Sequence, residues 1–176
     1  MIHGLMSEQE VEGMKGKARG HMKATPYSVG DVNQEFSYKR NSKIKYVSER
    51  TDELARSVTR RLERALAFRM FSQEDRYSSE NYQLMNYGFG GLISLHLDSS
   101  GSFESFDNDI GGGRFTTAML YLSTLVSGGA TVFPRLGLFF EPVAGDLLFW
   151  NLKKTDGSTD ERWGSKTILS LIKFSY

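Results

Sequence analysis

Two residues of the chain, His96 and Asp98, have the types and the spacing needed to hold a divalent metal ion. They close an apolar segment, residues 86 to 98, that reads NYGFGGLISLHLD. Because side chains at positions i and i+2 project from the same face of a strand, the imidazole and the carboxylate would point the same way. A histidine and a carboxylate placed together supply two ligands of the facial triad that binds non-haem iron(II).

The same pattern also fits an ordinary half-buried strand. From residue 93 to 98 apolar and polar residues alternate strictly. Ser94, His96 and Asp98 would then form a polar face that is directed to water. A tripeptide motif is too short to separate a metal site from such a face, so the residues alone leave both interpretations open.

Composition limits the class of protein. A chain of 176 residues that is 39% hydrophobic suits a single domain, residues 1 to 176, with a core of its own. The formal charge of +1 favours neither nucleic acid nor an anionic membrane. The absence of cysteine excludes disulfides, thiolate metal sites and cysteine nucleophiles. No apolar run reaches the length of a membrane span, and the first residues, MIHGLMSEQEVEG, lack the apolar segment of a signal peptide.

The first third of the sequence predicts two amphipathic helices. Ser7 and Glu10 have the spacing of a capping box, and apolar residues then recur at helical spacing to about residue 21. A second helix is expected to begin near Thr51. Its buried stripe is predicted to be Leu54, Val58, Leu62 and Leu66, and its opposite face carries Arg56, Arg60, Arg61 and Arg64. We interpret the arginine face as solvated surface in preference to a nucleic-acid site.

The remaining sequence predicts short strands between turns. Residues 24 to 46 read as short strands or loops, and residues 99 to 113, SSGSFESFDNDIGGG, read as a loop beside the metal-ligand pair. Runs of β-branched and aromatic residues predict strands at 115 to 125, 145 to 152 and 166 to 174, with a further short strand in SGGATVFP. Helices grouped before strands favour an α+β fold with a jelly-roll or β-sandwich core.

Four segments, taken in order, carry a family resemblance: NYGFGGLISLHLD, GGGRFTTAMLYLS, SGGATVFP and GDLLFWNL. Together they resemble the catalytic domain of the prolyl 4-hydroxylase alpha subunit, and the resemblance extends from about residue 7 to residue 173. Members of this family are iron(II)- and 2-oxoglutarate-dependent dioxygenases built on a distorted double-stranded β-helix, a form of jelly roll. The resemblance implies such a core here, flanked by N-terminal helices.

The resemblance also implies roles for particular residues. His96 and Asp98 match the first two iron ligands of the family. Tyr87 and Thr117 match residues of the 2-oxoglutarate pocket, and Lys166 matches the lysine that pairs with the distal carboxylate of this co-substrate. The implied cofactors are iron(II), 2-oxoglutarate and ascorbate. A lysine suits the role because its ammonium group is a compact charge on a flexible stem.

The third iron ligand of the family has no counterpart in this chain. It is a histidine about ten residues before the lysine, but the corresponding residues read DGSTDERWGS and no histidine follows His96. His3 and His21 are read as a chain-terminal and a helix-edge residue. The chain looks as if a segment between Trp163 and Gly164, including part of a core strand, had been removed.

Two further residues bear on this site. Asp160 or Glu161 is a conceivable substitute oxygen ligand for the absent histidine. Ile93 stands where related enzymes often have a tyrosine near the peptide substrate.

Two functions follow as alternatives. One is hydroxylation of peptidyl proline in a collagen-like substrate, impaired by the missing ligand. The other is a non-catalytic or truncated relative that binds metal or 2-oxoglutarate weakly. By resemblance, protein disulfide isomerase is an expected partner and the lumen of the endoplasmic reticulum the expected compartment, although no signal peptide is evident. Neither nucleic acid nor a membrane span is expected.

Overall fold

The structure is a computed structural model that describes residues 1–24, 27–29, 32–34, 42–67, 79–98 and 114–171. Of these, residues 27–29, 32–34 and 165–171 are described by their backbone only. The predicted loop over residues 99 to 113 lies outside the described residues. The elements are α1 (Glu8–Ala18), β1 (Lys23–Ala24), β2 (Tyr27–Val29), β3 (Val32–Gln34), β4 (Lys43–Val47), α2 (Glu53–Leu66), β5 (Tyr82–Asn86), β6 (Phe89–His96), β7 (Thr116–Leu120), β8 (Thr131–Phe133), η1 (Pro134–Leu136), β9 (Leu138–Phe140), β10 (Leu147–Asn151), η2 (Glu161–Trp163) and β11 (Ser165–Leu171).

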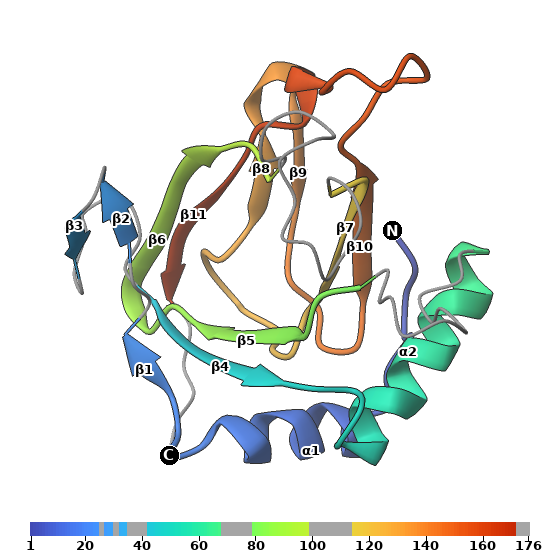
Figure 1. The fold of residues 1–176 in the computed structure, drawn as a ribbon. Coiled ribbons are helices and arrows are strands. Elements are labelled where there is room, and N and C mark those ends of the chain that lie inside the picture. Colours follow the sequence, from blue (N-terminus) through green and yellow to red (C-terminus); the bar gives the residue numbers. More distant parts are fainter. Residues whose placement is uncertain (25–26, 30–31, 35–41, 68–78, 99–113, 172–176) are drawn as a thin grey trace.

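Strands β4 to β11 form antiparallel sheets around a common interior, and the two helices lie outside it next to β4 (Figure 1). The hairpin β2-β3 stands apart, on the outer side of β6. The sheet orders are β1-β4-β5, β6-β11-β8-β9, β7-β10 and the hairpin β2-β3. Two helices in the first 66 residues and antiparallel strands around and after them confirm the predicted α+β class. Among the described residues, no helix is long and apolar enough to cross a membrane.

Helix α1 begins where its capping box predicts. The Ser7 hydroxyl accepts from the Glu10 amide at 3.3 Å, and the Glu10 carboxylate accepts in return from the Ser7 amide at 2.9 Å. The helix ends at Ala18, three residues before the predicted end. It stops there because Arg19 leaves the helical conformation and Gly20 adopts a φ of +74°, which ordinary side chains rarely adopt.

Asp52 is the N-cap residue of helix α2, and its carboxylate accepts a hydrogen bond from the Ala55 amide at 2.9 Å. Val58 and Leu62 are buried as predicted, but Leu54 and Leu66 are only partly buried. The fully buried positions that the leucine pattern missed are Ala55 and Thr59. The buried face therefore extends to one side of the predicted stripe, where small side chains allow α2 to pack closely.

The N-terminal segment covers the edge of β10. Ile2 and Leu147 exchange two backbone hydrogen bonds of 2.8 Å, and the Met6 amide donates to the Gly145 carbonyl at 3.0 Å. Gly145 has a φ of +91°, and a Cβ there would lie 2.5 Å from the Met6 carbonyl oxygen. Only glycine fits this position, because both the conformation and the close backbone approach exclude a side chain.

One hydrophobic core lies between the helices and the strands next to them, and a separate one contains an aromatic cluster, which we define as Phe133, Trp150 and Trp163. Phe133 is fully buried and packs edge-on against both tryptophans, with ring centroids 5.1 Å from Trp150 and 5.3 Å from Trp163. The contacts join β8, β10 and η2. They fix Trp163 directly before Gly164 and β11, the strand that pairs with β6 on one side and with β8 on the other.

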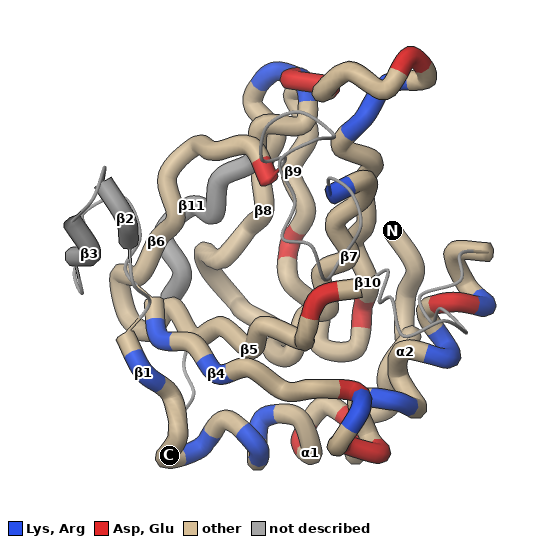
Figure 2. The backbone as a smooth tube through the Cα atoms, in the orientation of Figure 1, with Lys and Arg blue, Asp and Glu red and all other residues tan. Residues whose placement is uncertain are grey.

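Charged residues of both signs are interspersed along α1 and α2 (Figure 2). Arg56 donates to the carbonyl oxygens of Glu49 and Arg50, and Arg61 contacts the N-terminal segment. Two of the four α2 arginines therefore make contacts within the chain.

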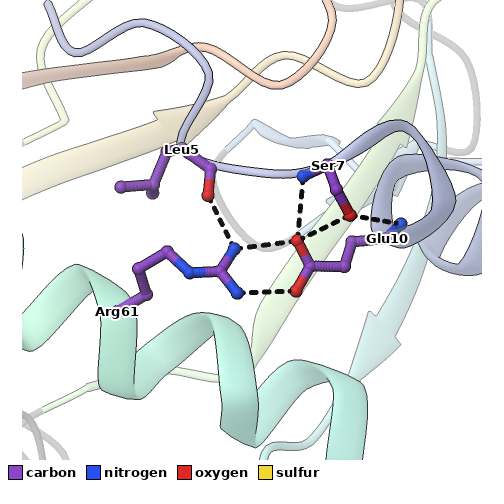
Figure 3. A network of polar contacts seen from close by, with 4 residues as sticks. All are labelled: Leu5, Ser7, Glu10 and Arg61. Carbon is purple, nitrogen blue, oxygen red and sulfur yellow. Dashed lines mark hydrogen bonds and ion pairs between the residues drawn. The ribbon is translucent and has the colours of Figure 1, made fainter.

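Arg61 joins α2 to the start of α1 through a bidentate ion pair (Figure 3). Its two terminal nitrogens each lie 2.8 Å from a Glu10 carboxylate oxygen, and one also donates to the Leu5 carbonyl at 2.6 Å. The hydrogen bond from Arg61, with help from Ser7, lowers the pKa of Glu10 to about 2 against the opposing effect of burial. The ionised form of Glu10 therefore stabilises the contact between the helices.

We expect Glu10→Gln to lower the free energy of unfolding at pH 7 by about 1–2 kcal/mol, since Arg61 is partly exposed and its pairing is screened by water. A carboxyl group with a lowered folded-state pKa stabilises above its unfolded pKa, and this contribution is lost as the pH falls from 4.5 to about 2. Urea unfolding of both proteins should show the difference shrinking over that range. Glu12→Gln, in an exposed pair with Lys15, is the control and should have little effect.

Candidate metal centre

His96 and Asp98 meet at the end of β6. The Nε2 atom of His96 lies 3.0 Å from Oδ1 of Asp98, and both side chains are partly buried. Asp98 lies two residues beyond the end of the strand, yet its carboxylate reaches the imidazole as the i, i+2 spacing predicts. The Nδ1 atom of His96 lies 2.9 Å from the carbonyl oxygen of Ser94, which fixes the orientation of the ring.

Thr117 brings a third side chain to this pair. Its hydroxyl, on β7, donates to Oδ2 of Asp98 at 2.9 Å. The two oxygens of the Asp98 carboxylate are thus held by different elements, Oδ1 by the end of β6 and Oδ2 by β7. The structure therefore brings together three of the five residues expected at the site.

Arg114 and Glu80 support the site and were missed by the sequence analysis. Arg114 donates to the backbone carbonyl of Asp98 at 3.2 Å, and it forms a two-pronged ion pair with Glu80, in which Nη2 lies 3.0 Å from Oε2. Glu80 precedes β5 and Arg114 precedes β7, 34 residues later. No local pattern connects residues so far apart, so only the fold reveals this contact.

The environment keeps the Asp98 carboxylate ionised. Burial raises the pKa of Asp98, but the hydrogen bond and charge of His96, the hydrogen bond from Thr117 and the charge of Arg114 outweigh it and lower the pKa below 3.8. A carbonyl oxygen and an ionised carboxylate are both acceptors, so His96 donates to both only when it is doubly protonated. A cation bound at Nε2 would replace one of these protons.

The donor atoms suit iron(II), but the fit is incomplete. Imidazole nitrogen and carboxylate oxygen are the ligands of a facial triad, which requires three protein ligands. Among the described residues, no group of three or more His, Cys, Asp or Glu side chains is placed to hold a metal ion. The described residues thus bring together two donors of the types that a facial triad uses, His96 and Asp98.

The conceivable substitute ligands are both paired with arginines. Arg162 contacts both carboxylate oxygens of Asp160, the closest at 2.6 Å, and its hydrogen bond lowers the pKa of Asp160 to about 2. Glu161 pairs with Arg135 at 2.9 Å. Using either carboxylate for a metal ion would require breaking its present ion pair.

No contact within the described part of the structure joins the other two expected residues to this cluster. Tyr87 lies between β5 and β6, and its hydroxyl donates to the sulfur of Met85 at 3.9 Å. Its backbone stands at the opposite end of β6 from His96. Lys166 has its backbone in β11 opposite Val132, and its side chain lies outside the described part of the structure.

The chain has similar proteins both by sequence and by structure. No family model matches the chain. It is 31% identical over 165 residues to prolyl 4-hydroxylase subunit alpha-2 of Caenorhabditis elegans, covering 92% of this chain and 30% of that protein. It is 29% identical over 154 residues to prolyl 4-hydroxylase subunit alpha-1 of Bos taurus, covering 85% of this chain and 27% of that protein. The chain therefore spans less than a third of the length of these relatives.

Two solved structures share the fold. A viral collagen prolyl hydroxylase from Paramecium Bursaria Chlorella virus-1, in a 2OG complex, superposes with a TM-score of 0.69 at 19% identity, covering 96% of this chain and 86% of the other. A Pseudomonas putida prolyl-4-hydroxylase gives a TM-score of 0.58 at 16% identity, covering 97% and 84%. At such low identity these matches support the fold alone.

Replacing Thr117 with valine keeps the shape of the side chain and removes its hydrogen bond to Asp98. Because this bond helps to lower the pKa of Asp98, we expect the pKa to rise toward its ordinary value, measured by a carboxyl-carbon NMR titration. The contribution of ionised Asp98 to stability would then be lost at a higher pH on acidification. Thr116→Val is the matched control, since that hydroxyl donates to the Trp150 carbonyl. Equal shifts in both variants would contradict the assignment.

Proposed function

The chain belongs by homology to the family of the prolyl 4-hydroxylase alpha subunits, and from this premise we propose that it is a prolyl-hydroxylase-type domain whose hydroxylation of peptidyl proline is impaired. The cluster of His96, Asp98 and Thr117 is the observation that carries the proposal. It places two donors of the right type beside each other. Impairment follows because the described residues offer no third His, Cys, Asp or Glu ligand in reach of them.

In this proposal each residue of the cluster has a distinct role. His96 and Asp98 bind iron(II), and the Ser94 carbonyl and the Thr117 hydroxyl orient the two ligands. Tyr87, Thr117 and Lys166 contribute to binding 2-oxoglutarate, as the resemblance implies. When bound, iron(II) and 2-oxoglutarate supply the oxidising chemistry, and ascorbate keeps the iron reduced.

The effect of the missing ligand on metal affinity can be given a lower limit. Removing even an outer-shell partner of a metal ligand typically lowers metal affinity about 10- to 100-fold, and a direct ligand should matter at least as much. The alternative function is therefore a non-catalytic relative that binds metal or 2-oxoglutarate weakly. The incomplete ligand set is the observation that favours this alternative.

The remaining parts of the proposal rest on homology. We propose one domain over residues 1 to 176 with a distorted double-stranded β-helix core. A proline-containing, collagen-like peptide is the proposed substrate. Assembly with protein disulfide isomerase and residence in the endoplasmic reticulum lumen remain predictions from the family resemblance.

Anaerobic titration with iron(II) and 2-oxoglutarate tests the proposed function directly. We expect a weak charge-transfer absorption that is lost in His96→Ala, and slow succinate formation when oxygen is admitted. His21→Ala is the matched control and should behave as the parent chain. If no charge-transfer absorption appears at millimolar ligand, the proposal that the chain is an enzyme is refuted. Absorption without succinate formation would favour the non-catalytic alternative.

A histidine at position 165 should restore the missing ligand. Ser165 is the backbone partner of His96 in the ladder between β11 and β6, and directly opposed residues project from the same face. We expect Ser165→His to bind cobalt(II) about 10- to 100-fold more tightly than the parent chain, measured by its visible absorption. Gly164→His is the matched control, because a Cβ at that position lies 3.5 Å from the Leu95 side chain and thus on the other face. An equal gain in cobalt(II) affinity in both variants would contradict the inference that position 165, and not 164, shares a face with His96.

A further inference from the structure

The N-terminal segment, residues 1 to 6, is fastened to the rest of the chain by one buried carboxylate. This carboxylate belongs to Asp146, the residue before β10, which is only 2% exposed. Its Oδ2 atom lies 2.7 Å from Nδ1 of His3, and its Oδ1 atom accepts from the Gly4 amide at 2.9 Å. In the sequence His3 is only a chain-terminal residue, because its partner lies 143 positions away.

The segment and the Asp146 carboxylate stabilise each other. Among the described residues, His3 and Gly4 supply the hydrogen bonds to this carboxylate, one to each oxygen. A buried carboxylate is costly unless it is paired and hydrogen-bonded. If the segment detached, Asp146 would lose both of these contacts at once.

The two members of this ion pair differ in their access to water. The side chain of His3 is 75% exposed, whereas that of Asp146 is 3% exposed. When the imidazole is doubly protonated, it donates a charge-assisted hydrogen bond to the carboxylate. When it is neutral, Nδ1 can still donate, but the attraction between opposite charges is lost. The contact is therefore stronger in the more acidic solution.

Other titratable groups around this contact keep one protonation state near neutral pH. Burial, together with the charge of Asp146, raises the pKa of Tyr121 to about 12, and the Tyr121 amide donates to the Asp146 carbonyl at 3.0 Å. Glu10, with a pKa of about 2, and its partner Arg61 stay ionised at the other end of the segment. The terminal amino group lies two residues from His3 and is retained in every variant below, so its contribution cancels.

We propose that His3 and Asp146 form a pH-sensitive latch, which fastens the N-terminal segment to β10 in acid and loosens it as His3 loses its second proton. The segment runs beside β10, where Ile2 and Leu147 exchange backbone hydrogen bonds (Figure 1). Loosening it opens this edge of β10. The other edge of β10 pairs with β7, the strand that carries Thr117. The latch does not depend on the proposed hydroxylation.

Amide hydrogen exchange of the whole chain tests the latch. The Leu147 amide donates to the Ile2 carbonyl at 2.8 Å, and the Met6 amide donates to the Gly145 carbonyl at 3.0 Å. Both amides exchange with solvent when the segment detaches. We expect their protection factors to fall about two- to fivefold between about pH 5 and about pH 8, the range in which histidines usually change charge. The change is small because water screens the exposed ring.

Histidine variants identify the group responsible. His3→Asn keeps a donor and removes the charge, so the fall in protection should disappear. His21→Asn is the matched control and should respond as the parent chain does, because His21 is exposed beyond the end of α1. Asp146→Asn should also remove the response. His3→Asn remains informative if Asp146→Asn fails to fold, since His3 is largely exposed.

Three outcomes would overturn the proposal. One is a parent chain whose Leu147 and Met6 amides are equally protected at both pH values. Another is a His3→Asn variant that keeps the full response of the parent chain. The third is loss of the response in His21→Asn, which would assign it to a different histidine.

Discussion

The burial of Phe133 between Trp150 and Trp163 is the contact on which the arrangement of the candidate metal centre depends. Phe133 joins three elements that are far apart in sequence. Through Trp150 it anchors β10, which holds β7 and so the Thr117 hydroxyl that contacts Asp98. Through Trp163 it anchors the turn that leads into β11, beside the end of β6. Close packing of aromatic rings thus sets the place of polar groups that do not touch them.

In the candidate metal centre Asp98 is held by several neighbouring groups, but the described residues provide no third metal ligand. Hydrogen bonds from His96 and Thr117, together with the charge of Arg114, keep the carboxylate ionised against the effect of burial. Such support is what a metal ligand needs, because oriented and charged donors lose little freedom on binding. The strand that follows Trp163 lies directly beside β6. Its first residue, Ser165, pairs with His96 at a position where a third ligand could stand.

Local sequence patterns predicted the elements better than their ends. The capping box at Ser7 gave the start of α1 because the hydrogen bonds involved join residues three apart. The predicted strand over residues 115 to 125 forms only from Thr116 to Leu120, since regular pairing depends on β10. The leucine spacing of α2 likewise missed Ala55 and Thr59, which are buried because of what packs on them. Propensity is local, whereas burial and pairing are not.

The sequence by itself determined the family resemblance, the α+β class and the His96–Asp98 pair, because each depends on residue types at short spacing. Only the tertiary structure decided which distant groups join that pair. Thr117 reaches Asp98, and Arg114 joins it to Glu80, through contacts that span 19 and 34 residues. Contacts of this kind follow from strand pairing and core packing, which no local spacing encodes.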